Sequence, residues 1–375
     1  MRRTTTNLGL RTTRHAPAGL ISRVADNCFW FGRYLERTES LARQLQAHRG
    51  LGLDGELTAH QCWHPIIVVT GEGENFRTHY GSAPITDGDT VERFLVWDER
   101  CWVTLSRSVA AARENARSIR EVLSGEVWET INELHLYLQN PAQGLATFEH
   151  QREDFYRKIR QMTQLALGLM RSTMLHDTAL DFVWLGVMLE RTNQTARLLD
   201  VHHHAFASNT SDSTSSSTPS TSPSQSQSQS PPSPPTHTPS APPDAPLHTS
   251  THQVIETAVW LTLLRACSGL EPFLKSNAGR VTPAAVARFL VADARFPRSI
   301  TYGVHAAYER FCYLRPPADV DLPGGEALAR LARLDTWLAS LPETHAALHA
   351  ILTHIVDETA QIAATIGKEL LGYDA

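Results

Sequence analysis

The chain has 375 residues, 42% of them hydrophobic, which is enough for two domains or for one large helical domain. The formal net charge of -5 argues against a general electrostatic attraction to nucleic acid or to anionic lipid, and no apolar run approaches the ~20 residues that span a bilayer. The five cysteines are odd in number and lack a CxxC spacing, so we expect buried free thiols, no disulfide framework and a cytoplasmic protein.

The predicted elements are helical from the start of the ordered chain. Residues 1–19 are rich in arginine, have no acidic residue and lack the apolar core of a secretory signal, so we expect a disordered basic tail. Ser22 then begins a helix with apolar residues at helical spacing. The apolar run 66–69 could form a strand, but the absence of partner strands favours a helix.

Further helix signals follow along the chain. Asp89 or Thr90 is expected to cap the helix through Phe94, and Thr282 before Pro283 combines a cap with proline in the first turn. Amphipathic helices are expected over 155–174 and 343–367. The predicted fold class is therefore all-α, a multi-helix bundle.

Residues 207–250 consist mainly of Ser, Pro, Thr and Gln, and Asp212 and Asp244 are their only charges. Such a segment cannot bury enough apolar surface to offset the entropy of ordering. We expect a disordered linker or a looped-out insertion.

Two halves of the chain repeat one pattern. Residues 30–38 (WFGRYLERT) match 184–192 (WLGVMLERT) at an offset of 154, and matches continue beyond the Ser/Pro segment at offsets of 197 and 195. The offset increases by roughly the length of that segment. We therefore predict two tandem, divergent copies of one helical unit, over 20–172 and 173–375, with residues 207–250 inserted into the second copy.

The Glu-Arg helices suggest a polar contact between the two copies. Glu36 lies four residues after Gly32 and seven before Arg43, so these residues share one helix face. Glu190 has the same relation to Gly186 and Arg197, whereas Arg37 and Arg191 point ~100° away. Packing around a pseudo-two-fold axis would bring two glutamates and two arginines together. This arrangement is either a structural ion-pair network or a site for an anionic or peptide-like ligand.

A second candidate site lies in residues 112–117 (ARENAR). Arg113 and Arg117 are one helical turn apart and, with Glu114 and Asn115, could bind a carboxylate or phosphate. The matching segment of the second half keeps only the glutamate. A solvated helix face is the alternative explanation.

Metal and nucleophile motifs are sparse. No Glu-x-x-His pair, phosphate-binding loop or nucleophile motif occurs, so we expect no cofactor. The run 202–204 of three histidines is expected to be a solvated helix end. His345 and His349 are one turn apart and form a weak metal candidate, because no third ligand is evident.

Residues 22–37 (SRVADNCFWFGRYLER) strongly resemble the start of the bacterial alpha-E family, a predicted alpha-helical domain with a Glu-Arg motif. The resemblance continues through 112–117, 172–177, 189–191 and 295–299, and covers nearly the whole chain outside the basic tail and the Ser/Pro segment. The family's biochemical activity is not established.

The resemblance implies a context. Alpha-E proteins are typically encoded beside, or fused to, a circularly permuted ATP-grasp protein and a transglutaminase-like protein, which implies a role in peptide synthesis or modification. We expect a non-catalytic scaffold or partner that holds such a ligase or its peptide substrate. The alternative is an enzyme of the same pathway that uses Glu36 and Glu190 as acid/base groups. The absence of a nucleophile, metal set or nucleotide loop favours the scaffold.

Overall fold

The computed structural model describes residues 21–53, 57–212, 247–341 and 347–373, and within these ranges it contains helices and no strand. The predicted all-α class is confirmed. The expected basic tail over 1–19 lies outside the described residues.

Within each described range the helices follow one another with short connections. In the first part of the chain they are α1 Ser22–Leu53, α2 Ala59–Thr70, α3 Gly73–Tyr80, α4 Gly88–Val96, α5 Leu105–Ser118, α6 Gly125–Gln139, the π-helical turn Pro141–Leu145, α7 Ala146–His150 and α8 Arg152–Thr173. In the second part they are α9 Thr178–Asp212, α10 Leu247–Ala266, α11 Leu270–Ser276, α12 Pro283–Ala292, α13 Ile300–Leu314, α14 Gly325–Ala339, α15 Leu348–Ile366 and the π-helical turn Gly367–Leu371.

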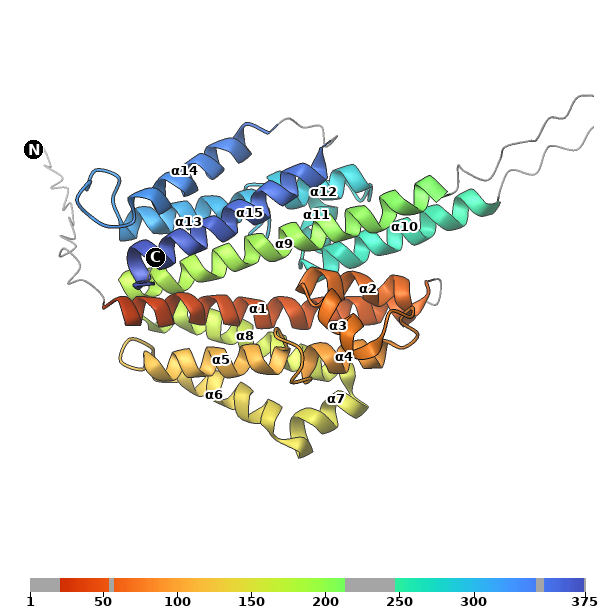
Figure 1. Cartoon of the computed structure of the whole chain (residues 1–375), viewed down its shortest axis with the longest axis horizontal. Coiled ribbons are helices and arrows are strands. Elements are labelled where there is room, and N and C mark those ends of the chain that lie inside the picture. Colours follow the sequence, from red (N-terminus) through yellow and green to blue (C-terminus); the bar gives the residue numbers. More distant parts are fainter. Residues whose placement is uncertain (1–20, 54–56, 213–246, 342–346, 374–375) are drawn as a thin grey trace, which may run out of the picture.

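The two longest helices, α1 and α9, lie side by side at the centre of the molecule (Figure 1). Glycine makes this close approach possible. A Cβ on Gly32 would lie 2.1 Å from the Val183 carbonyl oxygen, and one on Gly186 would lie 2.1 Å from the Phe29 carbonyl oxygen. Any larger residue at either position would force the helices apart.

Each central helix has its own set of partners. Helices α5 and α8 pack on α1, with α6 against both of them, and helices α13 and α15 pack on α9, with α14 against both of them. Figure 1 shows these two sets on opposite sides of the central pair. Continuous apolar clusters fill the space between the helices.

The local signals in the sequence agree with most helix boundaries. Thr282 caps α12 by accepting from the Ala285 amide, with Pro283 at the first helical position, as predicted. The apolar run 66–69 lies in α2, which is a helix as predicted. The predicted cap of α4 is wrong: Asp87 accepts from the Asp89 and Thr90 amides, because only a residue before the helix is free to turn its side chain back onto them.

The predicted boundaries of the Ser/Pro segment are also corrected. Helix α9 continues to Asp212 and α10 begins at Leu247, so helical backbone extends into both ends of the 207–250 range. Residues 213–246 lie outside the described part of the chain.

The five cysteines are free thiols and, except for the half-buried Cys312, they are buried, as expected. Burial raises the pKa of Cys28 and Cys267 to about 12, so these thiols are inert. Among the described helices, none combines the length and the apolar character needed to cross a membrane.

Candidate ligand pocket at the paired Glu-Arg motifs

The two Glu-Arg motifs bind each other across the α1–α9 contact. Glu36 accepts two hydrogen bonds from the Arg191 guanidinium, at 3.0 and 2.7 Å. Glu190 accepts two from Arg37, at 2.7 and 3.1 Å. Both carboxylates are almost completely buried. Each motif thus supplies the glutamate of one bidentate ion pair and the arginine of the other.

This pairing corrects the predicted one. Glu36 was expected to share its contact with Arg43, and Glu190 with Arg197, because these residues lie on one helix face. The structure instead pairs Arg43 with Glu39 on the preceding turn. Arg37 and Arg191, which directly follow the glutamates, make the contact between the helices. Gly32 and Gly186 let α1 and α9 lie close together, so a long arginine side chain can extend around its own helix to the other one.

The Glu36 end of this network is closed. Arg298, from the loop before α13, donates to Glu36 at 2.9 Å and to Glu39 at 2.6 Å. Glu39 also accepts from Gln164 of α8 at 3.2 Å, and pairs with Arg43. Three guanidinium groups, including that of Arg191, therefore surround the two carboxylates.

The Glu190 end is open. Besides Arg37, Glu190 accepts from Arg33 at 2.9 Å and from Gln194 at 3.1 Å. Next to it lies a cavity of about 120 Å³. The residues that line it come from α1, α2, α9 and the loop before α5, and they are Arg37, Leu41, Gln44, Thr70, Val103, Glu190, Asn193, Gln194 and Arg197.

Charge keeps the buried carboxylates ionised. Burial alone would raise the pKa of Glu190, but the charges of Arg33 and Arg37 outweigh it and hold this pKa at about 2. In the same way burial is outweighed at Glu39, where Arg298 and Arg43 hold the pKa at about 2. An acid that is fully ionised at neutral pH is a poor proton donor, so Glu190 is suited to orienting cations rather than to acid/base catalysis.

Arg197 is the exceptional residue of the pocket. Within the described part of the chain its guanidinium has no hydrogen bond and no ion pair, although it lines the cavity. Burial lowers the pKa of Arg197; the charge of Glu190 opposes this and that of Arg37 adds to it. Arg197 thus has an anion, Glu190, nearby but not in hydrogen-bond or ion-pair contact, which makes it a candidate binding group for a ligand that carries a negative charge.

Two amide side chains add unpartnered polar atoms. The Gln44 side-chain oxygen and the Asn193 side-chain oxygen are buried without a hydrogen-bond partner among the described residues. Both residues line the cavity. Because buried polar atoms are nearly always paired, these two oxygens are candidate acceptors for a water molecule or a polar ligand group in the cavity.

The other sequence-predicted site is not assembled as a clamp. Arg113 donates to Asn132 at 2.8 Å and lies over the Trp128 ring, whereas Arg117 pairs with Glu114 on its own helix and is exposed. The structure does not bring the two guanidinium groups to one point. Asn115 of the same helix is half-buried.

The structure also reveals charged groups that the sequence patterns missed. Arg298 and Arg33 complete the central network, yet neither belongs to a Glu-Arg pair. A separate buried carboxylate, Glu92, accepts from Arg152 at 2.6 Å, from Arg49 at 3.0 Å and from Tyr156 at 2.8 Å. The Glu92-Arg93 dipeptide alone does not single this carboxylate out, since the same dipeptide occurs at the exposed Glu99-Arg100.

Comparison with known proteins identifies the family. The model of a family described as "A predicted alpha-helical domain with a conserved ER motif" matches residues 20–371. The chain belongs to this Alpha-E family. Uncharacterized proteins of Mycobacterium bovis and Mycobacterium tuberculosis are 21% identical over 373 residues, which cover 89% of this chain. The match covers 36% of each relative, so the chain spans about a third of their length. No solved structure matches.

Proposed function

We propose that this Alpha-E chain is a non-catalytic helical module that binds a peptide-like ligand, through its carboxylate, in the pocket beside Glu190. The observation that carries the proposal is Arg197, a half-buried guanidinium that lines a cavity and has no anionic partner among the described residues. Arg37 also lines this cavity, but its guanidinium already forms an ion pair with Glu190.

The size and polarity of the pocket define the ligand class. A volume of about 120 Å³ holds about four water molecules at roughly 30 Å³ each, well below the size of nucleotide sites. It suits the carboxyl end of a chain. Arg197 would bind the carboxylate, and the unpartnered oxygens of Gln44 and Asn193 would accept from an amide N–H.

We further propose that the two halves arose by duplication. The pocket would then lie at the copy of the ion-pair network that has lost two of its charged residues. In support, α4 and α12 begin at 88 and 283, and α5 and α13 begin at 105 and 300, each 195 residues apart. At the same offset Arg298 corresponds to Val103, and at the offset of 154 Glu39 corresponds to Asn193. The residues that close the Glu36 end are thus replaced by smaller or uncharged ones at the Glu190 end.

The proposed partners are a circularly permuted ATP-grasp protein and a transglutaminase-like protein, which the family resemblance implies. A chain-end pocket is appropriate for holding a peptide substrate for such a ligase. The greater length of the mycobacterial relatives is compatible with a module that functions beside others. The free cysteines support the further proposal of a cytoplasmic location.

The alternative function is an enzyme of the same pathway. Its candidate acid/base groups are Glu36 and Glu190, and the low pKa of Glu190 disfavours it. Co-purification with the ATP-grasp protein and no turnover by the isolated chain would support the scaffold. Turnover by the isolated chain that is lost in Glu190→Gln would support the enzyme.

The pocket is tested by ligand-observed NMR with N-acetylglycine, which carries both a carboxylate and an amide N–H. We expect Arg197→Gln to weaken binding by about tenfold to a hundredfold, because a charge-assisted hydrogen bond contributes about 1.5–3 kcal/mol. Arg117→Gln, at an exposed arginine paired with Glu114, is the matched control and should bind as the wild type does. N-acetylglycine amide lacks the carboxylate and should not bind.

A second variant closes the pocket without removing a native charge. Val103→Arg combined with Asn193→Glu copies Arg298 and Glu39 into the Glu190 end. We expect this double variant to fold and to lose binding. Binding that survives both Arg197→Gln and the filled pocket would refute the proposed site.

A further inference from the structure

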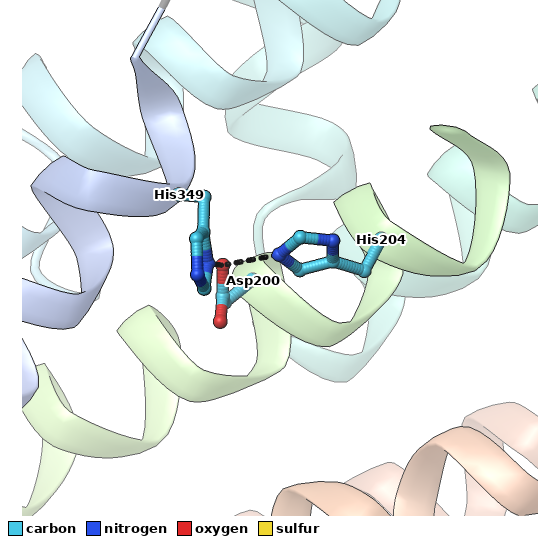
Figure 2. Close-up of side chains that lie close together, drawn as sticks. All are labelled: Asp200, His204 and His349. Atoms are coloured by element: carbon cyan, nitrogen blue, oxygen red, sulfur yellow. Dashed lines mark hydrogen bonds and ion pairs between the residues drawn. The ribbon is translucent and has the colours of Figure 1, made fainter. Parts of the chain in front are cut away.

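A group of metal-ligating side chains lies away from the Glu-Arg network, where α9 passes the start of α15. Asp200 and His204 are one turn apart on α9, and His349 is in the first turn of α15 (Figure 2). The His349 Nδ1 is 2.8 Å from the Asp200 Oδ1, and the His204 Nε2 is 3.8 Å from the same oxygen. All three ligand atoms lie within 4.8 Å of one another.

These separations suit a tetrahedral metal ion. With metal–ligand bonds of about 2.0–2.1 Å, the ligand atoms of a tetrahedral site are about 3.3 Å apart. The observed 2.8 and 3.8 Å to the Asp200 oxygen lie on either side of this value, and the two imidazole nitrogens are within 4.8 Å of each other, so side-chain rotations could bring all three atoms around one ion. The spacing of four also places Asp200 and His204 on one face of α9, beside His349.

The ligand set also indicates which ion fits. Two imidazoles and one carboxylate suit Zn²⁺ and its chemical neighbours, whereas Mg²⁺ and Ca²⁺ prefer oxygen ligands. The side chains of His204 and His349 are 53% and 55% exposed, so an ion can reach them from solvent and keep a water in its remaining position.

We propose that Asp200, His204 and His349 form a Zn²⁺ site that joins α9 to α15. A surface His-Asp ion pair alone contributes little to stability. A bound ion would add a cross-link between the two helices. The sequence prediction named His349 with His345; His345 lies outside the described residues, and both partners of His349 in this group, Asp200 and His204, are on α9.

The test is zinc binding by the metal-free full-length chain in competition with a chromophoric chelator. Loss of a residue that only supports a ligand weakens metal binding by about tenfold to a hundredfold, so loss of a direct ligand should cost at least roughly tenfold. We therefore expect His349→Ala and Asp200→Ala each to weaken Zn²⁺ binding by that amount. His203→Ala is the matched control, because it removes a histidine adjacent to His204 that is not in the group.

Two measurements make the result decisive. Zn²⁺ should raise the Tm of the wild type and leave that of His349→Ala unchanged, since an ion that binds only the folded state stabilises it. Co²⁺ should give the intense visible absorption of a tetrahedral site in the wild type alone. Equal losses in His203→Ala and His349→Ala would assign the ion to the histidine run on α9, and unchanged binding in His349→Ala would exclude the site; either result overturns the proposal.

Discussion

At the residue scale, Glu36 and Glu190 have matching partners but different surroundings. Each accepts a bidentate pair from the arginine of the other motif. Glu36 is then enclosed by Arg298, while Glu190 faces a cavity. Glu36 is therefore a structural group, whereas Glu190 belongs to a candidate binding site. The surrounding side chains, rather than the Glu-Arg motif itself, determine what each carboxylate can contact.

Removing the charge of Glu36 should destabilise the fold. Glu36→Gln leaves Arg191 and Arg298 buried with one carboxylate fewer, and breaking a buried pair in this way costs about 3–5 kcal/mol. Urea unfolding monitored by circular dichroism would measure this loss. Glu114→Gln, which removes an exposed partner of Arg117, is the control and should leave the unfolding midpoint nearly unchanged. A Glu36→Gln midpoint equal to that of the wild type would contradict the structural role.

The sequence could indicate these residues but not their partners. Helical spacing placed Glu36 and Arg43 on one face, and that is correct for a single helix. Which guanidinium reaches which carboxylate depends on the separation of α1 and α9, and on Arg298, which lies 262 residues from Glu36 in the chain. Neither is contained in a local pattern.

At the scale of elements, the α1–α9 contact depends on one glycine in each helix. The reciprocal approach of Gly32 to Val183 and of Gly186 to Phe29 brings the two backbones together. The repeated sequence around both glycines made this contact predictable, since a tryptophan, a glycine and a leucine precede each Glu-Arg pair at the same spacing. Helix existence followed equally well from apolar spacing, whereas exact ends, such as the Asp87 cap, required the structure.

Gly32→Ala and Gly186→Ala should each destabilise the protein. The added Cβ would overlap a carbonyl oxygen at 2.1 Å, and separating packed helices to relieve such overlap costs about 1–3 kcal/mol. Gly168→Ala is the matched control, because its Cβ would meet no atom within 4 Å in the interior of α8. There alanine should raise the free energy of unfolding by about 0.5–1 kcal/mol, through helix propensity. Opposite signs for the two kinds of variant are the expected signature in thermal melts.

At the scale of the whole molecule, α1 and α9 also bury a pair of histidines. His48 of α1 and His202 of α9 are almost fully buried, with ring centroids 5.5 Å apart. His202 corrects the expectation that residues 202–204 form a solvated helix end, since α9 continues beyond it and turns this side chain toward α1. Burial lowers the pKa of His48 to about 4 and that of His202 to about 3.

These histidines should make the fold sensitive to mild acid. The ordinary pKa of histidine is 6.5, so below this pH the unfolded chain binds protons that the folded protein does not bind. Stability is then complete above pH 6.5 and falls as the pH decreases toward about 3, by up to about 1.4 kcal/mol per pH unit for each histidine. Glu39 and Glu190 act in the same direction, but only below their ordinary pKa of 4.5 and down to about 2.

The histidine contribution can be separated from that of the glutamates by measuring the free energy of unfolding in urea at intervals between pH 7.5 and 4.5. The wild type should lose stability from about pH 6.5, above the range in which Glu39 and Glu190 contribute. In a His48→Gln/His202→Gln double variant the loss of stability between pH 6.5 and 4.5 should be clearly smaller. Burial also lowers the pKa of His64, His135 and His203, so these less buried histidines account for a remaining slope. His79→Gln, at an exposed histidine of α3, should keep the wild-type slope. A wild-type curve that is flat between pH 6.5 and 5 would mean that the buried pair is protonated as readily in the folded protein as in the unfolded chain, and the α1–α9 contact would then have to admit two positive charges.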